Sequence, residues 1–237
     1  MKNLLTLMCL CISVSFYAQD KQYFVKATDG YSHKKTSYLT LTDGTEIQGT
    51  IKNLNWKKGL FEEIKLKVDG KKVKYSAEDI AHMYLPQSGL DKLAKGLDFA
   101  YDATQWANKS DVNGELIQEG YAYFESAEVQ IKKKKTQVLL LQVVNPAFNS
   151  KVKVFHDPYA KKTMGLGIGG INVAGGIDKS YWVQTGDKPA FKLKKKDYDE
   201  TADMLFGDCD AYFETIKSNL VWKDFPMHVY DYVENCK

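Results

Sequence analysis

The sequence predicts an α+β fold, with a mainly antiparallel β body, a central helix and a C-terminal helical cap. Three observations lead to this fold class. Two Asp-Gly dipeptides each separate alternating apolar segments, an apolar stripe with helical spacing follows them, and the residues after Lys196 change to helical periodicity. We therefore expect hairpins first, and helices at the end of the chain.

The hairpins are expected around Asp43-Gly44 and Asp69-Gly70, because Asp-Gly between alternating apolar residues is a strong hairpin signal. Strand-like segments flank the two turns at 37–42 and 45–51, and at 64–68 and 71–75. Two hairpins so close in sequence predict a small antiparallel sheet or a partly closed barrel over residues 38–85.

A central helix is expected over residues 88–109, with Ser88 as its N-cap. One face carries a stripe at spacings of three and four residues: Leu90, Leu93, Leu97 and Tyr101. Phe99 and Trp106 lie on the opposite face. The helix is therefore either sandwiched inside the protein or offers Phe99 and Trp106 to a partner.

Five more segments have strand character, at 121–131, 137–144, 152–156, 181–184 and 191–193. Helical spacing follows after Lys196, carried by Tyr198, Ala202, Leu205, Phe206, Tyr212, Phe213, Ile216, Val229, Tyr230 and Val233. Residues 19–35 are polar and rich in turn-forming residues, so we expect a loose lead-in there.

The first 18 residues have the features of a secretory signal peptide. Lys2 gives a positive start, residues 4–16 are mostly apolar, and Ala18 offers a small residue for cleavage. The apolar run is shorter than the roughly 20 residues that span a bilayer. Cys9 and Cys11 lack the small preceding residue of a lipid-anchor motif, so a lipid anchor is the less favoured alternative.

Residues 19–237 are then expected to form a single exported α+β domain, located in the periplasm or at the outer membrane and not transmembrane. Its segments are hairpins at 36–86, the helix at 88–109, a β segment at 120–195 and a helical segment at 197–236.

Two cysteines remain after removal of the signal peptide, Cys209 and Cys236. In an oxidising compartment, an isolated pair indicates one disulfide. The alternative is two buried free thiols. A redox pair is not favoured, because the spacing is too wide for the Cys-x-x-Cys motif.

Composition argues against nucleic acid and nucleotide partners. The formal net charge is only +3, and every basic residue is lysine, whereas arginine is the residue best suited to grip phosphates. Residues 165–170 fit the pattern G-x-G-x-x-G, but no helix-forming segment follows to meet a pyrophosphate. We expect a flexible loop over 165–176 whose apolar residues contact a partner or membrane surface: Leu166, Ile168, Ile171 and Val173.

No catalytic, cofactor or metal site is expected. The histidines His33, His82, His156 and His228 are scattered, without the spacing of metal ligands. The motif Gly-x-Ser-x-Gly is missing from the sequence. Neighbouring carboxylates, such as Glu62-Glu63, point to opposite faces on a strand.

The chain resembles a family of exported Bacteroidetes proteins that has no established activity. The resemblance rests on the signal ending Tyr17-Ala18-Gln19, the segments 41–44, 49–51 and 205–209, and on Tyr75, Asp79-Ile80, Tyr181, Tyr232, Asn235 and Cys236. It implies residence in the periplasm or at the outer membrane, and it brings no catalytic residues.

The expected function is that of a non-catalytic envelope protein that binds another envelope protein or the membrane surface, through Phe99, Trp106 and the loop 165–176. A hydrolase of envelope polymers is the first alternative, and it requires a deep pocket with facing carboxylates or converging histidines. A binder of small apolar ligands is the second, and it requires a sizeable cavity in the β body.

Export predicts a mature chain that begins at Gln19. Intact-mass spectrometry of the protein from the cell that produces it should show the loss of residues 1–18. An Ala18→Leu variant is the matched control, because a bulky residue at the cleavage position should leave the first 18 residues attached. Their retention in the unaltered protein would contradict export.

Overall fold

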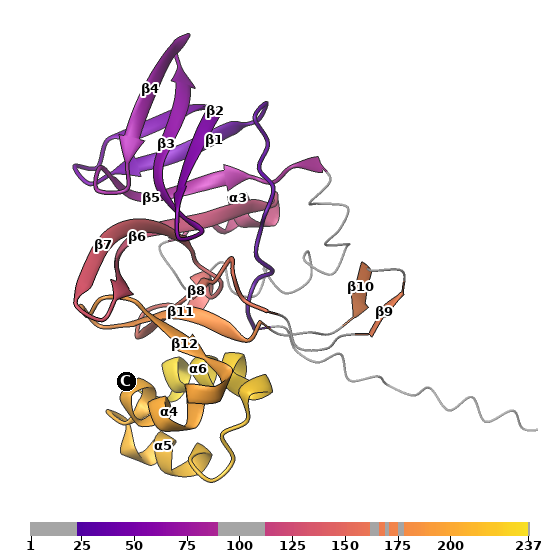
Figure 1. Cartoon of the computed structure of the whole chain (residues 1–237), viewed down its shortest axis with the longest axis vertical. Helices are drawn as coiled ribbons and strands as arrows, with labels where there is room; N and C mark the ends of the chain where they lie inside the picture. The colour runs from indigo at the N-terminus through magenta and orange to yellow at the C-terminus, as the bar shows by residue number, and fades with distance from the viewer. Residues whose placement is uncertain (1–22, 90–111, 162–165, 169–170, 175–177, 237) are drawn as a thin grey trace, which may run out of the picture.

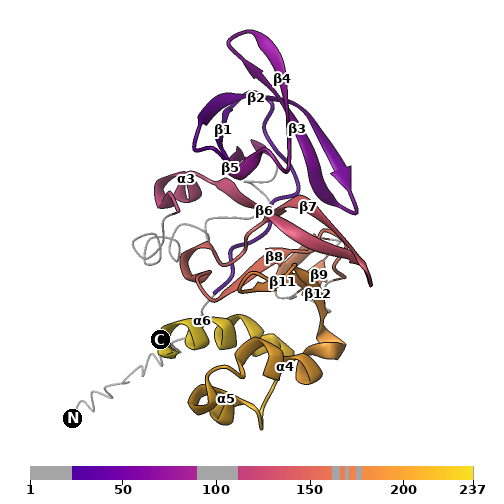
Figure 2. The same cartoon turned by 90° about the vertical axis from the view of Figure 1, so that its left-hand side faces the viewer.

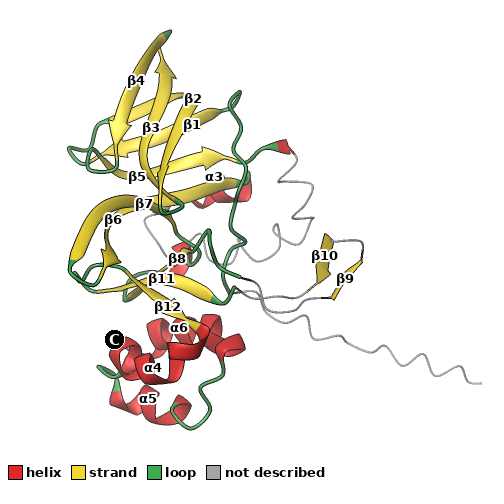
Figure 3. Cartoon of the chain, in the orientation of Figure 1, coloured by secondary structure: helices red, strands yellow, loops and turns green. Residues whose placement is uncertain are grey.

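The computed structural model describes residues 23–89, 112–161, 166–168, 171–174 and 178–236. It confirms the α+β fold class. Three layers are stacked along the long axis: a β-barrel, a three-stranded sheet and a group of helices (Figure 1, Figure 2). Figure 3 shows that strands make up the first two layers and helices most of the third.

The barrel sheet contains seven antiparallel strands in the order β2-β1-β5-β6-β7-β3-β4, and a further β2–β3 pairing closes six of them into a ring. β4 pairs with β3 outside this ring. The strands are β1 (Thr36–Leu41), β2 (Glu46–Lys57), β3 (Leu60–Val68), β4 (Lys71–Ser76), β5 (Ile80–Pro86), β6 (Tyr121–Lys132) and β7 (Lys135–Gln142). The expected hairpins are present, and the barrel is fully closed because β6 and β7 complete it.

The turns explain the order of the first strands. Between β3 and β4, Asp69 and Gly70 both have positive φ, at 47° and 81°. Two successive positive φ angles are typical of a two-residue hairpin turn, and they explain why the dipeptide Asp-Gly is favoured at this position. Lys58 and Gly59 repeat the pattern between β2 and β3, with φ of 55° and 81°.

Aliphatic and aromatic side chains fill the barrel interior. They come from all six ring strands and the β4–β5 turn: Leu39, Ile51, Phe61, Ile64, Leu66, Ala77, Ile80, Met83, Leu85, Ala122, Phe124 and Leu140. On β7, Leu140 points into the barrel, whereas Leu139 and Leu141 belong to a second cluster on the outside. β7 is therefore buried on both faces, which explains its unbroken apolar run.

The second layer is an antiparallel sheet in the order β12-β11-β8, which packs on the outer face of β6 and β7. Its strands are β8 (Val152–His156), β11 (Ser180–Thr185) and β12 (Phe191–Lys194). Trp182 and Phe155 point to the barrel, and Val154 and Val183 to the helices. The sheets are joined at Ala190, whose N–H donates to Glu128 O at 2.7 Å.

Residues 165–176 were expected to form a loop, and this prediction is wrong. Two short antiparallel strands occur there, β9 (Leu166–Ile168) and β10 (Ile171–Ala174), with Ile171 paired to Ile168. Alternating apolar residues separated by glycines are compatible with a hairpin, and backbone pairing satisfies the N–H and C=O groups that a loop leaves to solvent.

The third layer confirms the helical cap. Its helices are α4 (Tyr198–Phe206), α5 (Asp210–Ile216) and α6 (Phe225–Asn235), and α3 (Gly114–Gln118) lies beside the barrel. The 3-10 turns are Pro146–Phe148, Lys195–Asp197 and Trp222–Asp224. Cys209 at the N-cap of α5 and Cys236 at the C-cap of α6 form a disulfide with an S–S distance of 2.09 Å.

The lead-in was expected to be loose, but from residue 23 onwards it is an integrated part of the fold. Phe24 is buried in the helical layer, Val25 N–H donates to Val144 O at 2.7 Å, and Tyr31 forms a β-bridge with Gln87. The polar composition of this segment did not indicate these contacts, because backbone hydrogen bonds and a few aromatic side chains anchor it.

The expected central helix lies mostly outside the described residues, which end at Gly89 and resume at Val112. Among the helices that the structure describes, none has the length and apolar character needed to cross a membrane.

The disulfide predicts a measurable loss of stability when it is removed. Cys209 and Cys236 are separated by 27 residues, and closing such a loop stabilises the folded state by about 3.5 kcal/mol through the entropy of the unfolded chain. A Cys209→Ser/Cys236→Ser double variant should lower the free energy of unfolding in urea by about that amount. Reduction of the unaltered protein is the control and should give a similar loss. A change below about 1 kcal/mol would contradict this role.

Candidate functional site

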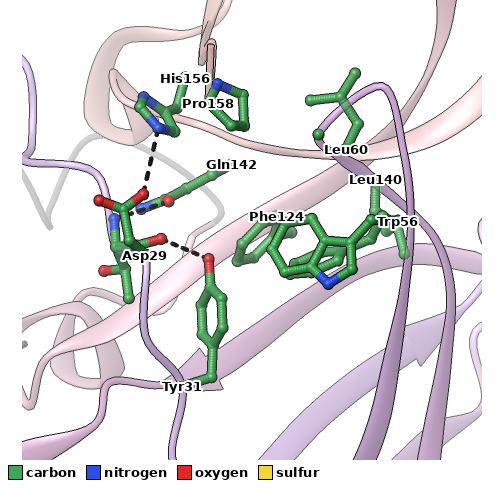
Figure 4. Close-up of a pocket in the computed structure, with 12 residues that line it drawn as sticks. Asp29, Tyr31, Trp56, Leu60, Phe124, Leu140, Gln142, His156 and Pro158 are labelled. Atoms are coloured by element: carbon green, nitrogen blue, oxygen red, sulfur yellow. Dashed lines mark hydrogen bonds and ion pairs between the residues drawn. The ribbon is translucent and has the colours of Figure 1, made fainter. Parts of the chain in front are cut away.

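A pocket of about 100 Å³ opens where β3 meets β7, the narrowest junction of the barrel. One register pair, Phe61 with Leu140, joins these strands, because β4 occupies the same edge of β3 from Glu63 onwards. The pocket is lined by the lead-in, the β2–β3 turn, the barrel and the end of β8. The residues are Thr28, Asp29, Tyr31, Trp56, Gly59, Leu60, Phe61, Phe124, Leu140, Gln142, His156 and Pro158 (Figure 4).

Aromatic rings that pack against one another at tilted angles form one wall of the pocket. The Trp56 ring lies 4.0 Å from Phe61, centroid to centroid, and Phe61 lies 5.2 Å from Phe124. Tyr31 adds an edge contact to Phe61 at 5.6 Å. Phe61 and Phe124 are buried, whereas Trp56 is 50% exposed. Trp56 therefore rests on the core and presents much of its indole to solvent.

A second exposed ring lies against the β2–β3 turn. Tyr159 is 67% exposed. A Cβ atom placed on Gly59 would come within 3.1 Å of its ring, so the glycine allows Tyr159 and Pro158 to lie against the turn. We call Trp56 and Tyr159 the aromatic rim.

Buried polar contacts hold the segment that carries Tyr159. The Asp157 carboxylate is 1% exposed and accepts hydrogen bonds from Ser180 Oγ at 2.6 Å, Lys192 Nζ at 3.0 Å and Tyr159 N at 3.2 Å. A buried carboxylate with three donors is a rigid support. The backbone position of Tyr159 is therefore fixed, while its ring extends to solvent.

The polar wall belongs to the lead-in and to β8. Tyr31 Oη donates to Thr28 O at 2.6 Å, and Thr28 N–H donates to the buried Gln142 at 3.0 Å. These bonds place Asp29 at the pocket, where its Oδ1 lies 3.7 Å from His156 Nε2. His156 Nδ1 lies 3.5 Å from Asp178 Oδ2.

His156 is thus placed between two carboxylates. Burial disfavours its charged form, but the attraction of Asp178 and Asp29 outweighs this effect and raises the pKa of His156 above its ordinary value. Among the described residues, neither ring nitrogen makes a hydrogen bond, so the interaction is electrostatic at ion-pair distance.

The contact residues expected from sequence are not among the described residues that line this pocket. Phe99 and Trp106 lie outside the described residues. Leu166, Ile168, Ile171 and Val173 lie on β9 and β10, whose side chains the structure does not describe.

The histidines do not converge within the described ranges, since His156 is the one that lines the pocket. His33 Nδ1 lies 3.2 Å from Ile51 O, His228 shares a hydrogen bond with Tyr198 Oη at 2.7 Å, and His82 contacts the rings of Tyr84 and Tyr123. Over those ranges, no group of three or more potential metal ligands occurs.

Four residues of the pocket and the aromatic rim were missed at the sequence level: Asp29, Trp56, His156 and Tyr159. They come from three separate segments that only the tertiary fold brings together. A local signal existed for two of them, because Trp56 precedes the polar turn Lys57-Lys58-Gly59 and Tyr159 follows Asp157-Pro158, and large aromatic rings beside such turns are candidates for exposure.

Comparison of the chain with protein-family models, with curated proteins and with solved structures found no match. The chemistry of the pocket therefore has to be inferred from its own residues. It offers an exposed aromatic surface, a small apolar recess, and a carboxylate and an imidazole on one wall.

The His156 pair predicts a specific pH dependence of stability. Because its pKa is raised in the folded state, His156 binds more proton there than in the unfolded chain. Its stabilising effect is complete below the ordinary value of 6.5 and is lost as the pH rises through the folded-state pKa. The difference in unfolding free energy between the unaltered protein and His156→Gln should therefore shrink as the pH rises above 6.5.

Urea denaturation at several pH values measures this difference. Asp178→Asn supplies the control, because removing one carboxylate should weaken the pH dependence of the His156→Gln effect. A difference that stays constant or grows with pH would show that the carboxylates do not hold the histidine charged.

Proposed function

We propose that this chain is a non-catalytic exported envelope protein that binds another envelope protein through the aromatic rim and the pocket beside it. The observation that carries the proposal is the exposure of two large rings at one turn: Trp56 lies at the end of β2, next to the β2–β3 turn, and Tyr159 lies against Gly59 of that turn. Large amphipathic rings of this kind dominate the energy of protein interfaces.

The rim has the structural features of a contact surface. Trp56 is supported from beneath by Phe61, and Tyr159 by the Asp157 network, so little conformational entropy is lost when a partner covers them. The neighbouring recess offers a place for one anchoring side chain. Rigid aromatic residues around a small recess are typical of interface hot spots.

The geometry favours binding over hydrolysis of a polymer. Glycoside hydrolysis requires two carboxyl groups that face each other across the scissile bond. Among the described residues that line this pocket, Asp29 is the one carboxylate and His156 the one imidazole. Asp178 lies behind the imidazole and does not line the pocket.

Binding of a small apolar molecule is also less favoured. Side chains fill the barrel interior, and the pocket of about 100 Å³ is well below the roughly 300 Å³ of a typical small-molecule site. Such a recess accommodates a side chain better than a whole ligand.

Residence beyond the cytosol is supported by the signal-like residues 1–18 and by the disulfide between Cys209 and Cys236. The proposed partner therefore belongs to the periplasm or the outer membrane. The resemblance to exported Bacteroidetes proteins points to the same location.

Site-specific photo-crosslinking in the producing cells tests this function. A photoreactive residue at position 56 or 159 should give the same discrete protein adduct. The same residue at position 204 is the matched control, because Met204 is 47% exposed but lies in the helical layer. Equal adducts from all three positions, or none from the rim, would contradict the proposal.

A substitution gives the expected magnitude. Trp56→Ala should lower the adduct yield from position 159 by about 30-fold, the factor that corresponds to a hot-spot loss of about 2 kcal/mol. A urea unfolding curve of the variant verifies folding. An unchanged yield would show that Trp56 lies outside the interface.

A further inference from the structure

We propose that β4 accepts an extended acidic segment of another protein as an added strand. The segment pairs with the edge of β4 that faces away from β3, and its carboxylates lie beside lysines of the β3–β4 hairpin. This surface is separate from the aromatic rim, so the inference does not rest on the function proposed above. An end strand, two facing pairs of lysines and the position of the hairpin carry it.

β4 is the end strand of the barrel sheet. Among the described residues it pairs with β3 alone, from Lys71 opposite Val68 to Ser76 opposite Glu63. The other six strands of the sheet close into a ring. An end strand leaves the N–H and C=O groups of its outer edge to solvent, and these groups are a template for a strand of another chain. Strand addition to this sheet is therefore expected at β4.

Four lysines form two directly facing pairs across the hairpin: Lys65 with Lys74, and Lys67 with Lys72. Ile64 and Leu66 on β3 are fully buried, so the lysines at alternating positions point to the outside of the barrel. We call these four residues the lysine ladder. Facing positions on neighbouring strands are about 5 Å apart between Cβ atoms, and like charges there destabilise a sheet.

The fold compensates little of the charge of the lysine ladder. Lys74 Nζ lies 2.8 Å from Glu63 Oε2, whereas the other three lysines form no ion pair among the described residues. On β2, the ladder faces the neutral residues Thr50 and Asn53. Four ammonium groups and one carboxylate leave a net charge of about +3 on this face. The face is therefore complementary to an acidic partner.

Protection of the sheet edge does not explain the ladder by itself. Lysines on an end strand discourage pairing with other chains, and this accounts for Lys72 and Lys74 on β4. It does not account for Lys65 and Lys67, because β3 is paired on both sides at these positions, with β2 and with β4. Carboxylates placed beside the ladder would offset the repulsion between its members.

The hairpin is accessible to a partner. Figure 1 and Figure 2 show β3 and β4 at the end of the molecule opposite the helical layer. Lys67, Lys72 and Lys74 are exposed. Between Glu63 and Lys67 on β3, and between Lys72 and Ser76 on β4, the residues on the outer face are all polar or charged. A lipid surface is therefore the less favoured partner, because peripheral binding to a bilayer also buries apolar side chains.

The alternation of β4 specifies the pattern of the segment. An added strand lies about 4.8 Å from β4, and its side chains alternate between the two faces with the same period. Positions beside Lys72 and Lys74 therefore take aspartate or glutamate. The position beside Val73 takes an apolar residue, because Val73 is partly buried on the opposite face, where Tyr75 packs against the barrel core.

The probe for this site is a short capped peptide in which glutamate alternates with valine and threonine. At a peptide concentration about ten times the dissociation constant, hydrogen exchange of the β4 amides that point away from β3 should slow about tenfold, the factor set by mass action. A peptide with the same charges but N-methylated along its pairing edge should give no protection. Glutamine in place of glutamate should weaken binding about tenfold, the effect of a few exposed ion pairs.

Lys67→Gln/Lys72→Gln is the decisive variant, because it removes one facing pair. It should weaken the glutamate peptide about fivefold, and its free energy of unfolding should not fall, since repulsion is relieved. Lys132→Gln/Lys135→Gln is the matched control: these lysines also face each other, at the end of the β6–β7 hairpin, and their loss changes the net charge equally. This control should bind the peptide as the unaltered protein does.

Four results overturn the inference. Exchange that stays unchanged at about 5 mM peptide shows that no segment binds. Equal protection by the N-methylated peptide indicates charge attraction without strand addition. Dextran sulfate that binds as tightly as the peptide indicates a general site for anionic polymers. Tighter binding of the glutamine peptide by Lys67→Gln/Lys72→Gln shows that the lysines serve to protect the edge. The photo-crosslinks at positions 56 and 159 test the aromatic rim independently of all four.

Discussion

The burial of β6 and β7 on both faces is the constraint on which the rest of the structure depends. Their inward side chains close the barrel, and their outward side chains form the floor on which the second sheet rests. The second sheet in turn supports the helical layer on its far side. Removing one leucine from β7, such as Leu140 or Leu141, would therefore affect one of two cores, but displacing the strand would affect all three layers.

The pocket arises from the same arrangement. β7 can meet β3 only where β4 does not occupy its edge, so the barrel closes through the Phe61–Leu140 pair and leaves a recess beside it. The lead-in crosses this junction and brings Asp29 to it. The end of β8 brings His156, and the β2–β3 turn brings Trp56. The proposed binding surface therefore forms where the layers meet, and no single helix, strand or turn provides all of it.

Much of the fold could be predicted from local sequence, whereas the pocket could not. Asp69-Gly70 predicted a turn because positive φ at two successive residues strongly selects such dipeptides. Cys209 and Cys236 were predicted to pair because, without residues 1–18, each of them has only the other as a possible partner. Closure of the barrel depends on pairing between β1 and β5 and between β3 and β7. These strands are far apart in the sequence, and the alternation of apolar residues does not indicate which distant strands pair. The integration of the lead-in rests on backbone bonds, such as that from Val25 to Val144, which leave no pattern in side chains.

The lead-in also has a consequence for the order in which the chain becomes complete. Thr28 is hydrogen-bonded to Gln142, a partner 114 residues later. A segment that leaves the ribosome early must therefore wait until more than half of the chain has been synthesised before it finds its place. Contacts so distant in sequence have a high entropic cost of closure and tend to form late in folding. Asp29 reaches its histidine only at that stage, so nascent or truncated chains lack the finished wall of the pocket.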